Sequence, residues 1–315
     1  MINGNKSLSR LEEEVIRVLA YYQIFHHPLM VKEVARFINI ATFSGEALND
    51  ALKTLLDLGV VFEFDGYYSL KNEASLVPKR LEGEVRAKSL MKVAKSMSRL
   101  IYFFPFVRAV FISGSLSKGV VPKDADVDYF IITKRNRLWI ARTILVVFKR
   151  LFLLGSKKYF CVNYFVDEDH MEIPDKNMFT ATEVVTLIPM QVDGFGLSFM
   201  KCNEWYDNYF PNVNLNKIEE RKESFIKRCS IFILEPPFFS SLAEKLDKHL
   251  LKKTYKRWQT LYNQGYSEKE FELAFRTQRG TSKNHDKNYQ KRVLNAVEGN
   301  LKSVMSKIKI QEIHE

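Results

Sequence analysis

The sequence predicts an α+β protein in which a mixed sheet is flanked by helices. Three observations lead to this fold class. Residues 107–166 follow the order strand, loop, strand, helix, strand; residues 1–73 contain three helical patterns and a hairpin; and the chain beyond residue 212 is mostly helical and basic. We therefore expect an N-terminal domain at 1–73, a sheet domain at 74–212 and a basic helical C-terminal region at 213–315.

Composition places the chain among ordinary globular proteins. Of its 315 residues, 46% are hydrophobic and 27% are charged, which excludes a collagen-like, mostly disordered or disulfide-stapled chain. Its three cysteines, Cys161, Cys202 and Cys229, show no Cys-x-x-Cys spacing, so we predict no disulfide framework and no structural zinc site, and we expect a reducing cytoplasm. The first ten residues lack an apolar signal core, and charged residues interrupt the most apolar stretch, Leu138–Leu154, so we expect no membrane partner.

The formal net charge of +11 is distributed unevenly along the chain. Residues 1–73 contain 7 basic and 10 acidic side chains, whereas residues 213–315 contain 21 basic and 13 acidic ones. The basic C-terminal region leaves RNA open as a partner, because contacts to nucleic acid phosphates require several cationic side chains.

The N-terminal domain begins with a capping box. Ser9 and Glu12 are spaced so that each side chain can bond the backbone N–H of the other, which opens a helix that ends near His27-Pro28. Two further helical patterns cover Val31–Ile38 and Ser44–Leu58.

A hairpin completes this domain. Asp65-Gly66, the strongest two-residue hairpin signal, joins the short β segments within Val60–Leu70. Three helices and a hairpin predict a winged helix, whose third helix can enter the major groove of DNA. That helix contains Glu46, Asp50 and Asp57 but only one cation, Lys53, so duplex DNA is an unfavourable partner and a protein contact or packing against the sheet domain is the better hypothesis.

The middle of the chain supplies the expected sheet. A long amphipathic helix leads into a run of apolar segments that are typical of buried strands, with one helix between the second and third strand. The expected elements are a helix at Pro78–Phe103, strands at Val107–Ser113, Val127–Thr133 and Lys158–Val166, and a helix at Asn136–Leu154, whose Val147 and Leu151 we expect to pack on the sheet.

The most informative motif joins the first two of these strands. The first strand ends in Gly114-Ser115, and after a spacer of ten residues the second begins with Asp126-Val127-Asp128. Because side chains alternate along a strand, Asp126 and Asp128 project from the same face. Two neighbouring carboxylates repel unless a cation or a proton compensates, and such oxygen ligands favour Mg²⁺ shared with substrate phosphates.

The residues of the bend suit a polyphosphate. Gly114 permits close approach of the backbone, Ser115 offers a hydroxyl and an N–H group, and the following residues are expected to start a helix whose free N–H groups favour anions. Ser117 and Lys118 add a donor and a positive charge. A triphosphate and a divalent ion would thus meet at one edge of the sheet, as in-line displacement at phosphorus requires.

This stretch resembles the signature of the DNA polymerase β-like nucleotidyltransferase superfamily: an apolar strand, Gly-Ser, a spacer, then Asp-apolar-Asp-apolar. The resemblance covers the middle domain. It implies a nucleotidyltransferase fold and a Mg²⁺-dependent enzyme that transfers a nucleoside monophosphate from a nucleoside triphosphate, ATP being the expected one, to a hydroxyl group of a small molecule, protein or RNA, with release of pyrophosphate. On this basis Gly114 and Ser115 match the phosphate-binding pair, and Asp126 and Asp128 match the metal ligands.

The sequence departs from this family pattern at the third carboxylate, which family members usually carry on a later strand. The corresponding strand here has a neutral Asn163 at its centre. Asp167 shares the parity of Asn163 but lies about 13 Å further along the strand. Either Asp167 supplies the general base or the site works with two carboxylates.

A weaker resemblance extends over more of the chain. The order of a winged helix, Cys161–Tyr164, Phe179–Glu183 and Asn203–Trp205 is similar to that of a group of uncharacterised bacterial nucleotidyltransferase-domain proteins. Two function classes therefore stay open: a nucleotidyltransferase, or a non-catalytic winged-helix adaptor or regulator that senses a nucleotide.

Overall fold

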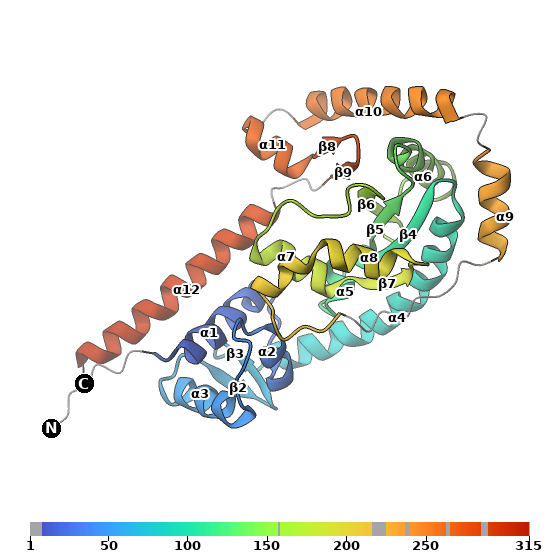
Figure 1. Cartoon of the computed structure of the whole chain (residues 1–315). Helices are drawn as coiled ribbons and strands as arrows, with labels where there is room; N and C mark the ends of the chain where they lie inside the picture. Colours follow the sequence, from blue (N-terminus) through green and yellow to red (C-terminus); the bar gives the residue numbers. More distant parts are fainter. Residues whose placement is uncertain are drawn as a thin grey trace.

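The computed structural model describes residues 8–156, 158–215, 225–236, 240–262, 265–284 and 289–314. Its architecture is α+β, with a six-stranded mixed sheet flanked by helices, which confirms the predicted class. A smaller unit at the N-terminal end packs beside this sheet domain, and the last helix runs from the sheet domain along the N-terminal unit (Figure 1).

The N-terminal unit follows the predicted order. Its elements are α1 (Arg10–Gln23), β1 (Leu29–Met30), α2 (Val31–Phe37), α3 (Gly45–Asp57), β2 (Phe62–Phe64) and β3 (Tyr67–Ser69). The capping box of Ser9 and Glu12 is present at the start of α1, as predicted. The hairpin is present as well, with Asp65 and Gly66 both at positive φ (52° and 79°), and the three strands form an antiparallel sheet in the order β1-β3-β2.

The long helix α4 (Leu76–Phe103) leads into the main sheet. The next elements are β4 (Val107–Ser113), α5 (Gly114–Ser117), β5 (Asp128–Thr133), α6 (Leu138–Phe152), β6 (Cys161–Asp167), α7 (Met178–Thr186), β7 (Ile188–Gln191), α8 (Phe195–Cys202) and a 3-10 turn at Glu204–Asn208. β5 and β6 run parallel, joined by α6, and the other pairings are antiparallel. This arrangement agrees with the predicted order of strands and helices.

The C-terminal region is mostly helical, as expected, but it also contributes two strands that the sequence did not predict. It contains α9 (Phe225–Leu234), α10 (Ser240–Tyr262), α11 (Glu268–Ala274), β8 (Thr277–Gln278), β9 (Thr281–Lys283) and α12 (Tyr289–His314). Strands β8 and β9 join the main sheet, whose order is β7-β4-β5-β6-β9-β8. These strands are short and polar, and therefore lack the apolar alternation by which a strand is recognised in sequence.

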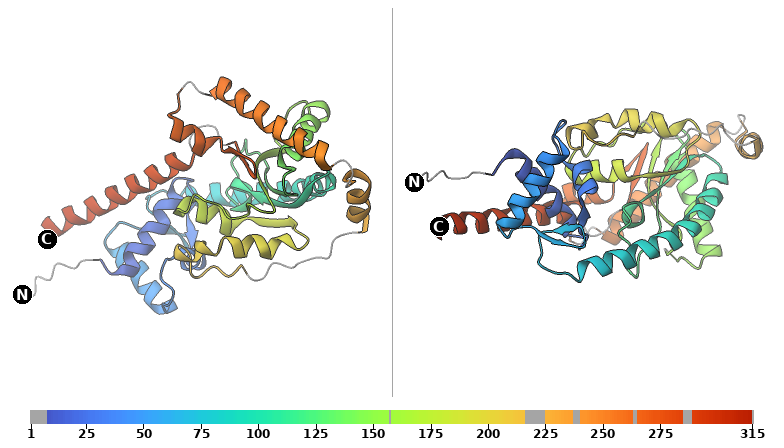
Figure 2. Two further views of the ribbon diagram at one scale, coloured as in Figure 1. Left: turned by 45° about the horizontal axis from the view of Figure 1, so that its top comes forward. Right: turned by 90° about the horizontal axis from the view of Figure 1, so that it is seen from below.

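The main sheet is buried on both faces. One face packs on α4 and α6, and the other packs on α7 and α8, so that the sheet lies between two helical layers (Figure 2). Along β5, Tyr129 and Ile131 face the α4 and α6 layer, whereas Phe130 and Ile132 face the α7 and α8 layer. Alternation along the strand therefore assigns each residue of the motif to one face.

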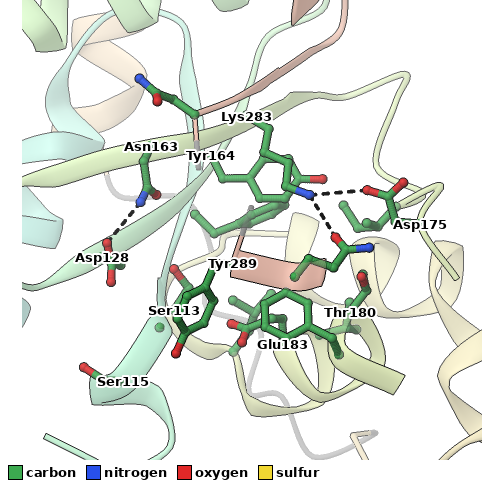
Figure 3. Close-up of a pocket in the computed structure, with 18 of the residues that line it drawn as sticks. Ser113, Ser115, Asp128, Asn163, Tyr164, Asp175, Thr180, Glu183, Lys283 and Tyr289 are labelled. Atoms are coloured by element: carbon green, nitrogen blue, oxygen red, sulfur yellow. Dashed lines mark hydrogen bonds and ion pairs between the residues drawn. The ribbon is translucent and has the colours of Figure 1, made fainter. Parts of the chain in front are cut away.

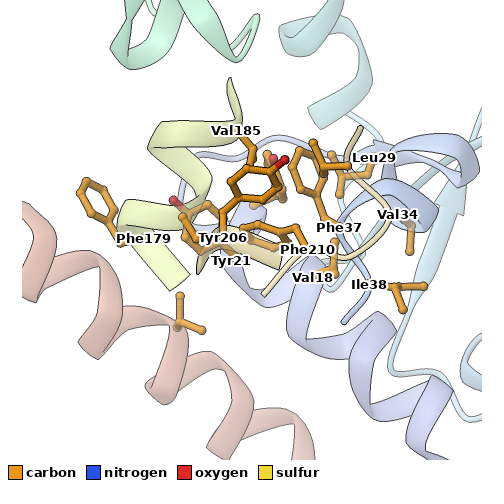
Figure 4. Close-up of a cluster of buried hydrophobic side chains, with 14 of the residues drawn as sticks. Val18, Tyr21, Leu29, Val34, Phe37, Ile38, Phe179, Val185, Tyr206 and Phe210 are labelled. Atoms are coloured by element: carbon orange, nitrogen blue, oxygen red, sulfur yellow. The ribbon is translucent and has the colours of Figure 1, made fainter. Parts of the chain in front are cut away.

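The N-terminal unit shares its hydrophobic core with the sheet domain. Phe37 of α2 meets Phe210, which follows the 3-10 turn, in an edge contact with 5.4 Å between ring centroids. Tyr21 of α1 lies beside α7, close to Phe179 and Val185 (Figure 4). Helix α12 packs along both α1 and α7. The N-terminal unit is therefore in direct contact with α7 of the sheet domain.

Helix α6 differs from the expectation in one respect. Its N-terminal half is buried, including Leu138, Trp139 and Leu145, but Val147 and Leu151 are exposed rather than packed on the sheet. No helix among the described residues is both long and apolar enough to span a bilayer.

Candidate functional site

The bend after β4 lies directly against the first residue of β5. Ser113 pairs with Asp128 in the antiparallel register, and the chain then turns into the single helical turn α5. Gly114 has a φ of +66°, and a Cβ at this position would lie 2.3 Å from Oδ2 of Asp128. Position 114 therefore requires glycine for two reasons: the left-handed backbone and the adjacent carboxylate.

The motif predicts Asp126 and Asp128 on one strand, but only Asp128 lies within β5. Val127 and Tyr129 point into the core on the α4 and α6 side, so Asp128 projects from the opposite face, and Asp126 precedes the strand by two residues. The pKa of Asp128 is raised to about 6, first because burial disfavours its charged form and further because Asp126 and Glu183 are negative. The two predicted carboxylates therefore interact electrostatically.

A cavity of about 410 Å³ opens between this end of the sheet and α7 (Figure 3). Its polar lining includes Ser113, Ser115, Asp128, Asn163 and Glu183. Aromatic and aliphatic side chains form most of the remaining walls, namely Phe130, Tyr164, Ile173, Phe179, Val184, Leu187, Phe199 and Tyr289. The volume lies within the range of small-molecule sites.

A β-bulge in β6 brings two consecutive residues into this cavity. Tyr129 pairs with Val162 and Phe130 pairs with Tyr164, so that Asn163 has no partner of its own in β5. Asn163 and Tyr164 both line the cavity, and Asn163 Nδ2 donates to Oδ1 of Asp128 at 3.1 Å. Asn163 Oδ1 is buried and accepts no hydrogen bond from the described residues.

The structure places Asp167 away from the site. Because the bulge shifts the alternation, Phe165 lies on the α4 and α6 side and Asp167 shares its face, contrary to the parity expected from sequence. Asp128 pairs with Cys161 at the start of β6, whereas Asp167 pairs with Thr133 at its end. Asp167 therefore lies at the opposite end of the strands from Asp128.

The contacts of the Asp167 carboxylate show a structural role. It is buried, and it accepts hydrogen bonds from the backbone N–H groups of Asn136 (3.2 Å) and Asp169 (3.1 Å). Its Oδ1 also lies 2.6 Å from Nδ1 of His170. These contacts stabilise the turn that follows β6.

Ser117 and Lys118 do not line the cavity. The hydroxyl of Ser117 donates to the carbonyl of Gly114 at 2.9 Å. Lys118 Nζ donates to the same carbonyl at 3.1 Å and forms an ion pair with Glu183 at 2.8 Å. Of the residues that the motif predicts, the structure thus brings Gly114, Ser115 and Asp128 to the cavity wall. Asp126 is not among the lining residues, and Ser117 and Lys118 support the bend behind the wall.

Glu183 is a site residue that the motif did not identify. It lies on α7, which Asn177 caps by accepting from the N–H of Thr180 at 3.0 Å. Thr180, Glu183 and Val184 face the cavity at the i, i+3, i+4 spacing of one helix face. Glu183 is the one charged residue within Met178–Thr186, and a lone acid in an apolar helix was the available signal.

The C-terminal region closes the far end of the cavity. Lys283 of β9 is buried, and its Nζ lies 3.4 Å from Oδ2 of Asp175 and 3.1 Å from Oε1 of Gln290 on α12. Arg276 pairs with both oxygens of Asp175, at 2.9 and 3.1 Å. The sequence contained no motif for this cluster, because Asp175 lies more than a hundred residues from its partners Arg276 and Lys283.

The residues present suit a cation that is shared with a substrate. Within the described part of the chain, no three His, Cys, Asp or Glu side chains gather closely enough to hold a metal by themselves. Asp126 and Asp128 provide two carboxylates, and the unpaired Oδ1 of Asn163 provides a buried carbonyl oxygen beside them. Mg²⁺ commonly takes one or two carboxylates and completes its shell with phosphate oxygens and water, so this donor set fits it.

No protein-family model, curated protein or solved structure matches the chain.

Proposed function

We propose that the protein is a Mg²⁺-dependent nucleotidyltransferase of the DNA polymerase β-like type, with Gly114, Ser115, Asp126 and Asp128 at its active site. One observation carries the proposal: the Gly114 bend and the Asp128 carboxylate are in contact and line the same cavity. Triphosphate binding and metal binding must coincide at one point for transfer at phosphorus. A bend and a pair of acids at separate places would not meet this requirement.

The bend would orient the phosphates. Ser115 lines the cavity with its side chain, and the positive φ of Gly114 lets the backbone approach a ligand closely. Lys118, held at the back of the bend by Gly114 and Glu183, adds positive charge beside the phosphates. Asp126 and Asp128 would hold Mg²⁺, which when bound neutralises charge on the phosphate under attack.

Glu183 is the residue we assign as general base in place of Asp167. It faces the cavity from α7, and its charge acts on Asp128 across the site. In the proposed reaction the acceptor oxygen forms a bond to the α-phosphorus, the bond from that phosphorus to the bridging oxygen breaks, and pyrophosphate leaves. The proton of the acceptor hydroxyl passes to the Glu183 carboxylate, which forms an ion pair with Lys118 at 2.8 Å.

We also propose that the N-terminal unit is a winged helix used for packing and protein contact. The order of its elements and the β1-β3-β2 sheet support this description. Glu46, Asp50 and Asp57 are exposed on α3, so the helix that would enter a DNA groove presents mainly negative charge. The negative charge on α3 therefore disfavours binding of this unit to duplex DNA.

A second candidate function is a nucleotide sensor without chemistry. It is favoured by the neutral Asn163 where the family that the motif resembles usually carries a carboxylate, and by the packing of α12 against both α1 and α7. In such a regulator, nucleotide binding beside Glu183 would alter the position of α7 and, through it, the N-terminal unit. ATP binding without release of pyrophosphate, across a wide panel of acceptors, would support this function over the enzyme.

The experiment that tests the enzyme uses each labelled nucleoside triphosphate with Mg²⁺ and an extract of the host cell as the source of acceptors. We expect the wild-type chain to transfer label and release pyrophosphate, and the double variant Asp126→Asn with Asp128→Asn to do neither while staying folded. A matched control, Asp50→Asn with Asp57→Asn, removes the same charge from α3 and should leave turnover unchanged. Equal turnover by wild type and the site double variant would refute the proposal.

A further inference from the structure

The C-terminal end of α6 exposes an apolar tip, which we define as Leu151, Phe152 and Leu154. These side chains are 69%, 70% and 94% exposed. Single apolar residues on a surface are common, but three large ones in four positions form a patch that calls for a partner. Phe148 on the same part of α6 packs on Phe104 and Phe160, whereas the three side chains of the tip leave most of their surface in solvent.

The apolar tip has a defined backbone. The N–H of Gly155 donates to the carbonyl of Lys149 at 3.0 Å, and the N–H of Ser156 donates to that of Leu153 at 2.8 Å. Leu154 has a φ of +49°, a left-handed conformation that glycine or asparagine usually takes at a helix end. A leucine held in a disfavoured conformation with its side chain in solvent indicates a functional constraint.

Cationic side chains flank the apolar tip in the sequence. Lys149 and Arg150 precede it, Lys157 and Lys158 follow it, and residues 149–158 contain no Asp or Glu. Arg150 and Lys158 are exposed on either side of the tip, and Tyr159, which is 39% exposed, lies with its ring centroid 5.4 Å from Nζ of Lys158. Leucine and phenylalanine beside lysine, arginine and an interfacial tyrosine are the composition that binds membrane interfaces.

We propose that the apolar tip inserts into the surface of an anionic lipid bilayer, with Arg150 and Lys158 contacting the lipid headgroups. This contact requires no membrane-spanning helix. A second copy of the chain is a poorer partner for the tip, because a two-fold interface would place the cations of one copy against the same cations of the other.

The tip lies at the same edge of the main sheet as the candidate site. The N–H of Val127, which stands between Asp126 and Asp128, donates to the carbonyl of Lys158 at 3.0 Å.

The test is co-sedimentation of the full chain with vesicles. We expect binding to vesicles of equal parts phosphatidylglycerol and phosphatidylcholine, and little binding to phosphatidylcholine alone. The triple variant Leu151→Ser, Phe152→Ser and Leu154→Ser should reduce the bound fraction at least roughly ten-fold, because the apolar contact supplies the insertion. A control, Leu81→Ser with Val85→Ser, removes exposed apolar side chains from α4 and should bind as wild type does.

A second pair of measurements separates the sources of binding. Arg150→Gln with Lys158→Gln keeps the apolar tip and should lose the preference for anionic vesicles, and high salt should act on the wild type in the same direction. Wild-type chain that fails to sediment with anionic vesicles would overturn the proposal. So would a triple variant that binds like wild type, or a dimer in solution that the triple variant dissociates while vesicles have no effect.

Discussion

Gly114 and Asp128 contact each other so closely that no side chain fits between them: a Cβ at position 114 would lie 2.3 Å from Oδ2 of Asp128. This contact joins the bend that we propose for phosphate binding to a carboxylate that we propose as a metal ligand. It also makes glycine a requirement of the site rather than only of the turn.

We expect Gly114→Ala to abolish nucleotide binding and to lower stability by more than the ~1 kcal/mol typical of a left-handed alanine. The matched control is Gly119→Ala, because Gly119 has nearly the same φ (+69°) but no atom within 4 Å of its would-be Cβ. Thermal unfolding and calorimetry with ATP and Mg²⁺ would measure both effects. If the two variants behaved alike, the Asp128 contact would not explain the need for glycine.

Replacing Glu183 tests the assignment of the general base. Glu183→Gln should lower turnover by roughly 10²- to 10⁴-fold while leaving nucleotide affinity nearly unchanged, since a base acts on the acceptor's proton. Lys118→Met removes the same ion pair without removing the carboxylate. Because Lys118 is also assigned to the phosphates, ATP affinity is measured for both variants beside the single-turnover rate, and we expect only Lys118→Met to weaken it. Wild-type turnover in Glu183→Gln would refute the assignment of Glu183 as the base.

Asp167→Ala should affect stability rather than chemistry. The variant leaves the N–H groups of Asn136 and Asp169 without their buried acceptor, which costs about 1–3 kcal/mol. Urea unfolding measures this cost, and turnover per folded molecule should equal that of wild type. Loss of turnover at unchanged stability would restore Asp167 as a catalytic candidate.

Asp247 should make stability depend on pH. Its carboxylate is buried against the start of α6, accepting from the N–H of Ile140 at 3.0 Å, and burial raises its pKa to about 6 from an ordinary 3.8. Because the pKa of Asp247 is higher in the folded state, the folded chain holds the proton more tightly than the unfolded chain does. The resulting gain in the free energy of unfolding is complete below pH about 4 and is lost as pH rises through about 6.

The size of this effect is about 1–3 kcal/mol, given that one pKa unit corresponds to 1.36 kcal/mol and that solvent screens part of the shift. Urea unfolding of wild type and Asp247→Asn across this pH range measures it. The asparagine retains an oxygen to accept from Ile140 but does not ionise, so its stability should change less with pH. Parallel pH profiles would show that other groups cause the dependence.

Local sequence was sufficient for most of the secondary structure. The capping box at Ser9, the Asp65-Gly66 hairpin and the apolar strands depend on neighbours within a few residues, so their patterns are visible in the chain. The same holds for the Gly-Ser bend and the paired aspartates. The polar strands β8 and β9 could not be predicted in this way, because their pairing with β6 comes from long-range contacts.

The α+β class, the Gly114-Ser115 bend and the position of Asp128 at the start of a strand follow from the amino-acid sequence alone, because each depends on backbone rules that act over a few residues. Which other side chains line the cavity beside the bend and Asp128 depends on the packing of the whole fold. One extra residue at Asn163 turned Asp167 to the other face, and the packing of α7 and β9 on the sheet brought Glu183 and Lys283 to the cavity. Those placements depend on how distant elements pack, and no local pattern encodes them.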